Sequence, residues 1–129
     1  MQGVTKLEAA VIEKLLDGDH PTLNVLREQW KGCRVRSRDH TGVGFYTFFE
    51  VGTGTPKVGT AGFELADVSA DIPALRNGAG FVLFVRNGSI DNLEGFSYDE
   101  ALPTDIPDFS LRYNRSPRLL DLPLPSSYP

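Results

Sequence analysis

Three arginines at alternate positions are the most distinctive polar feature of this chain. In a β-strand, Arg34, Arg36 and Arg38 would project from one face at intervals of about 7 Å. A row of guanidinium groups is suited to binding an anion or an acidic partner. The same spacing is also expected on a strand face that is exposed to solvent or covered by another segment. The three arginines are therefore candidate binding residues, and they are not assigned a catalytic role.

The aromatic strand that follows is expected to neighbour the arginines. If Phe45 and Phe49 face the core, the arginines must lie on the face of Tyr46, Phe48 and Glu50. Cation–π contacts and charge pairing would then be available to them.

A second candidate group lies on the last predicted strand, at 89–98. Glu94 and Tyr98 share one face of a predicted strand, with Asn92 and Phe96 in line with them. A carboxylate, an amide and a phenol would line a polar groove, and general acid–base catalysis needs such a carboxylate with a shifted pKa. Since a solvent-facing or arginine-paired carboxylate fits the same pattern, Glu94 and Tyr98 are candidates for binding only.

The remaining reactive side chains match no catalytic or metal-binding motif. His20 and His40 lie at predicted turns, without the spacing of metal ligands, and Cys33 is expected to be a buried structural thiol. The glycine-rich loop at 52–59 lacks the lysine of a phosphate-binding loop, and neither a dinucleotide-binding nor a nucleophile-elbow motif occurs. We therefore expect no metal and no cofactor, and the absence of these motifs favours a protein that is not an enzyme over an enzyme of a common class.

Length, charge and cysteine content narrow the class of protein. A chain of 129 residues, 40% hydrophobic and 23% charged, is expected to fold as one domain without metal or disulfide. The net charge of −4 disfavours nucleic acid as a partner, because phosphate binding relies on clustered lysine and arginine. One cysteine, no signal-like start and no long apolar run predict a cytoplasmic protein without a membrane partner.

Two short helices are predicted near the N-terminus. Thr5 and Glu8 have the spacing of a capping box, and the apolar residues that follow predict a helix over about 6–17. Pro21 suits the first position of a second helix, which is expected to end at Gly32. We expect these helices to form a hairpin that covers one face of a sheet.

From residue 33 the apolar pattern changes to a period of two, which is typical of strands. About five strands are expected, over 33–38, 45–51, 60–72, 80–86 and 89–98. The third of them changes phase near Ala66 and Asp67, which predicts a β-bulge. Because short connections favour antiparallel neighbours, the predicted fold is α+β, with an antiparallel meander sheet behind the helical hairpin.

A β-hairpin is expected around the Asn-Gly step at 87–88, since both residues accept the positive φ of a type I′ turn. The register of its strands is open. A two-residue loop places Val85 opposite Ile90, whereas a three-residue loop places Leu83 opposite Leu93. This single residue of register decides whether Glu94 points toward the core or away from it.

Two segments resemble one group of proteins. Residues 80–98 combine a Val/Phe-rich strand, an Asn-Gly turn and the sequence Leu-Glu-Gly-Phe-Ser-Tyr, and residues 15–27 begin Leu-Leu-Asp-Gly-Asp-His-Pro. They are similar to the closing hairpin and the helical start of a group of small, uncharacterised bacterial proteins. The resemblance covers about the first hundred residues. It implies a bacterial origin and a compact α+β fold, and implies no activity, cofactor or substrate.

The chain is expected to divide into a domain at 1–103 and an extended arm at 104–129. Residues 101–129 hold six of the nine prolines, which disfavours a helix or a central strand there. Large apolar residues such as Leu119 and Leu122 predict that the arm docks, either on its own domain or on a partner subunit.

These features favour a non-enzymatic, cytoplasmic protein–protein interaction or accessory module, including the immunity-like kind. Its partner would be an unknown protein or a second copy in a homodimer. The alternative is a small-molecule or anion-binding domain, or a weak hydrolase. That alternative would use one sheet face bearing Arg34, Arg36, Arg38, Glu94 and Tyr98.

Overall fold

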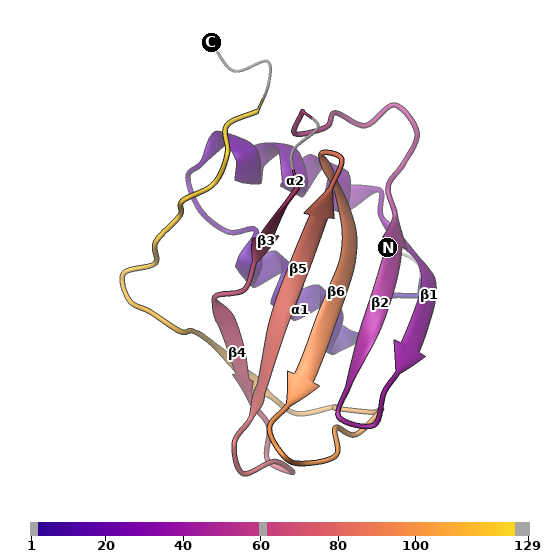
Figure 1. Cartoon of the computed structure of the whole chain (residues 1–129), viewed down its shortest axis with the longest axis vertical. Helices are drawn as coiled ribbons and strands as arrows, with labels where there is room; N and C mark the ends of the chain where they lie inside the picture. The colour runs from indigo at the N-terminus through magenta and orange to yellow at the C-terminus, as the bar shows by residue number, and fades with distance from the viewer. Residues whose placement is uncertain (1–2, 60–61, 126–129) are drawn as a thin grey trace.

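The computed structural model describes residues 3–59 and 62–125. The first two positions of the predicted third strand, 60 and 61, and the end of the predicted arm, 126–129, lie outside these residues. The fold is α+β, as expected: two helices lie on one face of an antiparallel sheet (Figure 1). Within the described residues no helix has the length and apolar character needed to span a membrane.

The helices are α1 (Lys6–Leu15) and α2 (Pro21–Lys31). The predicted capping box at the start of α1 is present, because the Glu8 backbone N–H donates to Thr5 Oγ1 (3.1 Å) and the Thr5 N–H donates to Glu8 Oε1 (2.9 Å). Pro21 opens α2, and His20 Nδ1 accepts from the backbone N–H of the next residue but one. Local sequence therefore determines where both helices begin.

The sheet has seven strands rather than about five. They are β1 (Arg34–His40), β2 (Gly44–Glu50), β3 (Phe63–Leu65), β4 (Val68–Asp71), β5 (Ala79–Arg86), β6 (Ser89–Ser97) and β7 (Ser110–Tyr113). Their order is β1-β2-β6-β5-β4-β7, and β3 also pairs with β5. The predicted meander order is wrong because β6 inserts between β2 and β5, and β7 near the C-terminus is an additional strand.

The predicted bulge near Ala66 and Asp67 is present and divides one extended segment into β3 and β4. Both strands pair with β5, and the register shifts by one residue between them: Leu65 lies opposite Leu83, whereas Ser69 lies opposite Gly80. Because of the extra residue at this bulge, both β3 and β4 direct apolar side chains toward the core.

The β5–β6 hairpin combines features of both registers that the sequence left open. Its turn has two residues with positive φ, as predicted, and Val85 lies opposite Ile90. Farther from the turn, Leu83 lies opposite Leu93, because β6 contains one extra residue just after Ile90. This bulge turns Glu94 away from the core while Ile90 and Leu93 both stay buried.

The hydrophobic core lies between the helices and the inner face of the sheet, which we define as the face that the helices cover (Figure 1). Its largest fully buried side chain is Phe81, and the buried Trp30 of α2 meets Phe49 of β2 edge-on, with ring centroids 5.5 Å apart. Gln29 is also fully buried, and its side chain bonds to the backbone of two loops.

Residues 104–125 lie against the same molecule. β7 pairs with β4, Tyr113 Oη donates to the Lys14 carbonyl (2.7 Å), and the Thr22 hydroxyl donates to the Pro123 carbonyl. Arg118 binds Asp67 through two nitrogens, at 2.6 and 3.0 Å. The same guanidinium donates to carbonyls at the end of α1, so it joins this segment to both the helix and the sheet.

Substituting Arg118 with methionine is expected to lower the free energy of unfolding by about 2–3 kcal/mol, because charged hydrogen bonds that are largely buried are lost. The side chain is only 11% exposed. Arg115→Met, at an exposed position of the same segment, is the matched control and should change stability by less than about 0.5 kcal/mol. Urea unfolding measures both variants. If Arg118→Met unfolds with the same free energy as Arg115→Met, Arg118 does not hold this segment in place.

Candidate functional site

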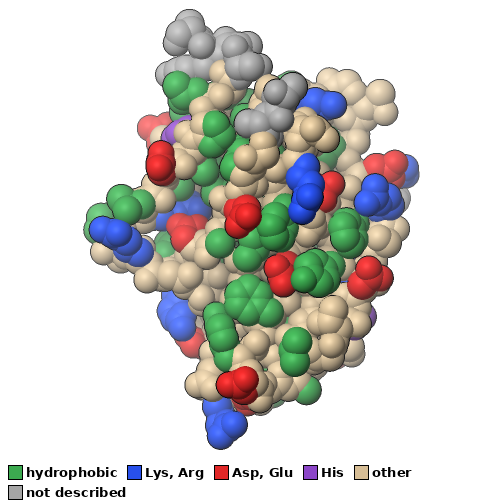
Figure 2. Space-filling model, viewed as in Figure 1, with side chains coloured by type: hydrophobic (Ala, Val, Ile, Leu, Met, Phe, Trp, Pro, Cys, Tyr) green, Lys and Arg blue, Asp and Glu red, His purple; other side chains and the backbone are tan. Residues whose placement is uncertain are grey.

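The outer face of the sheet, which points away from the helices, carries most of the residues singled out in the sequence. Residues directly opposite each other across antiparallel strands share a face, so the strand register defines rows on it. One row contains Asp39, Tyr46, Glu94 and Val82, and the next contains Ser37, Phe48, Asn92, Phe84 and Glu64. Hydrophobic side chains extend over this face with charged ones among them (Figure 2).

Aromatic side chains give the outer face its apolar character. They are Tyr46, Phe48, Phe84, Phe96 and Tyr98. The first four are half-buried by their neighbours, and Tyr98 is 45% exposed. Neither the helices nor residues 104–125 cross this face in the part of the chain that the structure describes (Figure 1).

Two of the three predicted arginines lie on this face. Arg34 Nε donates to Glu50 Oε2 (2.9 Å), and the Arg36 guanidinium lies 5.6 Å from the centre of the Phe48 ring. Both contacts are of the kinds expected from the sequence. They are exposed, and each contributes little to stability.

Arg38 is on the opposite face, so the expectation that the three arginines share a face is wrong. The register between β1 and β2 shifts at Arg36: Val35 pairs with Phe49, but Ser37 pairs with Phe48. This bulge reverses the alternation, and Arg38 therefore extends toward α1 from the inner face. A period-of-two pattern in the sequence cannot reveal an inserted residue of this kind.

Glu94 and Tyr98 both lie on the outer side but contact different residues. Tyr46 Oη donates to Glu94 Oε2 (3.0 Å), whereas the Tyr98 ring packs edge-on against Phe96 with centroids 5.6 Å apart. The hydrogen bond to Glu94 and the charge of that carboxylate raise the pKa of Tyr46. Tyr46 is thus a phenol that stays protonated and is bonded to the Glu94 carboxylate.

The charges on the outer face do not balance. Arg34 pairs with Glu50, Arg86 with Asp91 and Arg112 with Asp71. Asp39, Glu64 and Glu94 have no cationic partner among residues 3–59 and 62–125, and Arg36 has no carboxylate partner there. The face therefore presents a surplus of negative charge beside its aromatic rings.

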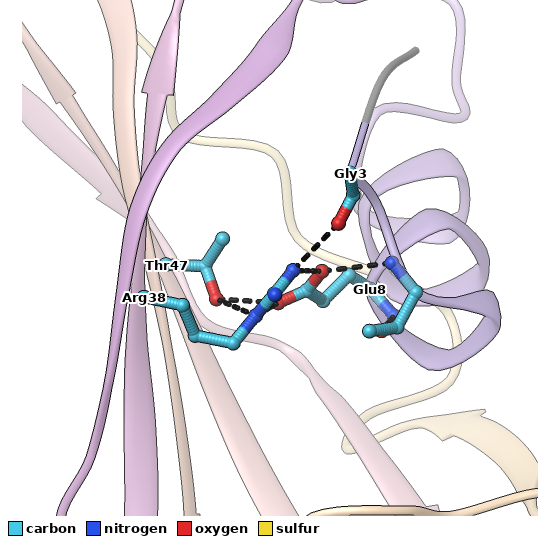
Figure 3. A network of polar contacts seen from close by, with 5 residues as sticks. Gly3, Glu8, Arg38 and Thr47 are labelled. Carbon is cyan, nitrogen blue, oxygen red and sulfur yellow. Dashed lines mark hydrogen bonds and ion pairs between the residues drawn. The ribbon is translucent and has the colours of Figure 1, made fainter.

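A buried polar network lies on the inner face, between α1 and the β1–β2 hairpin (Figure 3). Arg38 donates from Nε to Glu8 Oε2 (2.9 Å) and from Nη2 to Glu8 Oε1 (2.6 Å). The Thr47 hydroxyl donates to the same carboxylate, and the Gly3 carbonyl accepts from Arg38 Nη2 (2.8 Å). The Glu8 side chain is 2% exposed and that of Arg38 24%.

Opposing effects act on the Glu8 carboxylate. Burial alone raises its pKa, but hydrogen bonds from Arg38, Thr47 and the Thr5 N–H, together with the charge of Arg38, outweigh burial and lower the pKa below its ordinary value. Glu8 is therefore held ionised and fully bonded, which indicates a structural role rather than that of a proton donor.

The described residues contain no group of three histidine, cysteine or acidic side chains able to hold a metal ion. Cys33 is buried, as predicted, and burial raises the pKa of its thiol to about 11. A thiol with so high a pKa is poorly reactive at neutral pH, because the thiolate is the nucleophile.

Comparison of the chain with protein-family models, with curated proteins and with solved structures finds no match. The resemblance to small bacterial proteins therefore stays a prediction. Functional inference rests on the outer face and on the cavities of this structure.

Sequence reasoning missed several members of the outer face. Asp39 and Glu64 become neighbours of the aromatic rings only through strand register, and Phe84 lies in the predicted strand at 80–86, to which the sequence assigned no outer face. Residues 81–85 are apolar throughout, so no alternation of polar and apolar side chains marks one face of this strand as uncovered.

Proposed function

We propose that this protein is a non-enzymatic protein-interaction module whose outer sheet face docks a basic, partly apolar surface of another protein. The observation that carries the proposal is the combination, on one uncovered face, of five aromatic side chains and three carboxylates without cationic partners. Contiguous apolar surface with a polar surround is typical of interaction sites.

The aromatic residues supply the affinity in this proposal. Tyrosine and phenylalanine are enriched at the centres of protein interfaces, where they bury a large area at a small cost in side-chain entropy. Phe48 and Phe84 flank Asn92, which is itself buried, so the rings form a continuous surface across β2, β6 and β5. A rigid sheet is already organised to receive a partner.

The charges indicate the kind of partner. Asp39, Glu64 and Glu94 attract lysine and arginine, and they repel nucleic acid and a second copy of the same face. A basic protein surface is therefore favoured over self-association. Among accessory roles, an immunity-like one, in which a small acidic cytoplasmic domain masks a basic partner, fits these charges.

We also infer that the helical hairpin and the proline-rich arm stabilise the sheet and take no part in binding the partner. Support comes from the buried faces of α1 and α2 and from the contacts of Arg118 with Asp67 and with the end of α1. In this proposal the arm after residue 103 docks on its own domain and leaves the outer face open.

The alternative of an anion-binding or hydrolytic sheet face has less support. Arg38 extends to the inner face, Arg34 is engaged by Glu50, and Glu94 accepts its hydrogen bond from Tyr46 rather than facing a cavity. The five predicted residues therefore do not converge on one substrate position.

A site-specific crosslinking experiment tests the proposal. A photoreactive phenylalanine analogue at Val82, on the outer face, is expected to capture one protein in cells, and the same analogue at Glu13, exposed on α1, is not. The captured protein is then purified and titrated against the full chain. Glu94→Lys and Phe84→Ser should each weaken binding at least tenfold, whereas Glu28→Lys on α2 should not.

Two outcomes would contradict the proposal. One is a captured protein whose affinity is the same for Glu94→Lys, Phe84→Ser and the unsubstituted chain. The other is a stable dimer in light scattering that Phe84→Ser dissociates, because this result would make a second copy the occupant of the face.

A further inference from the structure

A cavity of about 340 Å³ lies on the far side of the sheet from the outer face. It is lined by the first turn of α1, by the inner side of β1 and the start of β2, and by residues 103–107. Its size is within the range of small-molecule sites in proteins. The cavity shares no lining residue with the outer face described above, so an inference about it is independent of the proposed function.

Basic groups from two elements meet at this cavity. Arg38 and His40 alternate on the inner side of β1, about 7 Å apart along the strand, and Lys6 lines the cavity from α1. Glu8 and Gly3 use two of the three guanidinium nitrogens of Arg38, and Nη1 has no hydrogen-bond partner among the described residues. Donors for an anionic group are therefore available in the wall.

Apolar side chains form another part of the wall. Leu7 and Phe45 are buried core residues, and Ile106 packs against the same core from the other side of the cavity. Pro103 and Pro107 complete this side of the wall and contribute no backbone donor. These residues provide apolar contacts for the body of a ligand.

The charge balance limits the anion to one negative charge. Glu8 already neutralises Arg38, and Lys6 Nζ donates to the Pro107 carbonyl (3.4 Å), so His40 and the open Arg38 nitrogen remain to face the ligand. A phosphate dianion would be undercompensated, whereas a carboxylate matches the available donors.

We propose that this cavity binds a small organic monocarboxylate, with its carboxylate beside Arg38 and His40 and its apolar body against Leu7, Phe45 and Ile106. The apolar contacts contribute to affinity, and the donors select the acid over its neutral analogue, because a carboxylate offers two charged acceptor oxygens and an amide offers one neutral one.

Titration of the isotope-labelled full chain followed by two-dimensional NMR tests this proposal. Benzoate serves as the probe, and benzamide is its neutral counterpart of the same shape. Benzoate should shift the backbone amide signals of Leu7, His40 and Ile106 saturably, and benzamide should bind at least tenfold more weakly. The chain Glu94→Lys should bind benzoate unchanged, which separates this site from the outer face.

Variants at the edge of the cavity provide the second readout without disturbing the Glu8–Arg38 pair. His40→Ala should weaken benzoate binding at least threefold, and Thr104→Trp, which fills the cavity, should abolish it. Thr53→Trp, in an exposed loop elsewhere, should have no effect. Equal affinities for benzoate and benzamide, unsaturable shifts, or full binding by Thr104→Trp would each overturn the proposal.

Discussion

Glu8→Ala is expected to lower the free energy of unfolding by about 3–5 kcal/mol, the cost of removing one partner from a buried ion pair. The carboxylate accepts from Arg38, Thr47 and the Thr5 N–H, so its removal leaves several donors without an acceptor on the inner face (Figure 3). It also removes half of the capping box of α1. Urea unfolding followed by circular dichroism measures the loss.

Two control variants separate the ion pair from the helix. Glu13→Ala removes an exposed glutamate from the same helix and should change stability by less than about 0.5 kcal/mol. The double substitution Glu8→Leu with Arg38→Met should recover much of the loss, because an apolar pair leaves no buried charge behind. If the double variant is no more stable than Glu8→Ala, the loss does not arise from the unpaired guanidinium.

The same carboxylate predicts how stability depends on pH. Since the folded-state pKa of Glu8 lies below its unfolded value, its contribution is fully present above the unfolded pKa and is lost as pH falls through the folded pKa. The difference in unfolding free energy between the unsubstituted chain and Glu8→Gln should therefore shrink as pH decreases below about 4.5, the ordinary value for this group. A constant difference would contradict this assignment.

Gln29→Leu should lower the free energy of unfolding by about 2–5 kcal/mol, since each buried polar group left without a partner costs about 1–3 kcal/mol. The amide nitrogen donates to the carbonyls of Pro56 (3.0 Å) and Gly88 (2.8 Å), and Oε1 accepts from the Ile90 N–H (2.9 Å). One fully buried side chain thus ties α2 to the β5–β6 turn and to the preceding loop.

A substitution at the neighbouring residue, Glu28, is the control for this prediction. Glu28→Leu changes an exposed residue of α2 that forms only a surface ion pair, so its effect should stay below about 1 kcal/mol. Amide hydrogen exchange gives a local readout: the Ile90 N–H should exchange faster in Gln29→Leu relative to core amides of β5. Unchanged exchange at Ile90 would contradict the role assigned to this hydrogen bond.

Local chemistry determined the beginnings of both helices, the fold class and the central turn. Thr5 and Glu8 satisfy each other's backbone donors, Pro21 has no donor to lose, and Asn87 with Gly88 accepts positive φ. Each of these preferences is set by residues a few positions apart, so the sequence carries it directly. The one-residue interruption near Ala66 was also predictable, because a change of apolar phase within a strand has few other causes.

The tertiary structure decided strand order and the two remaining bulges. The one at Arg36 sends Arg38 to the inner face, where Glu8 of a helix thirty positions away is its counter-charge. The one after Ile90 keeps Glu94 out of the core while satisfying both hairpin registers. Neither bulge has a local cause. Each one gives the strand register in which side chains from distant parts of the sequence are best buried or paired, and those side chains meet only in the folded chain.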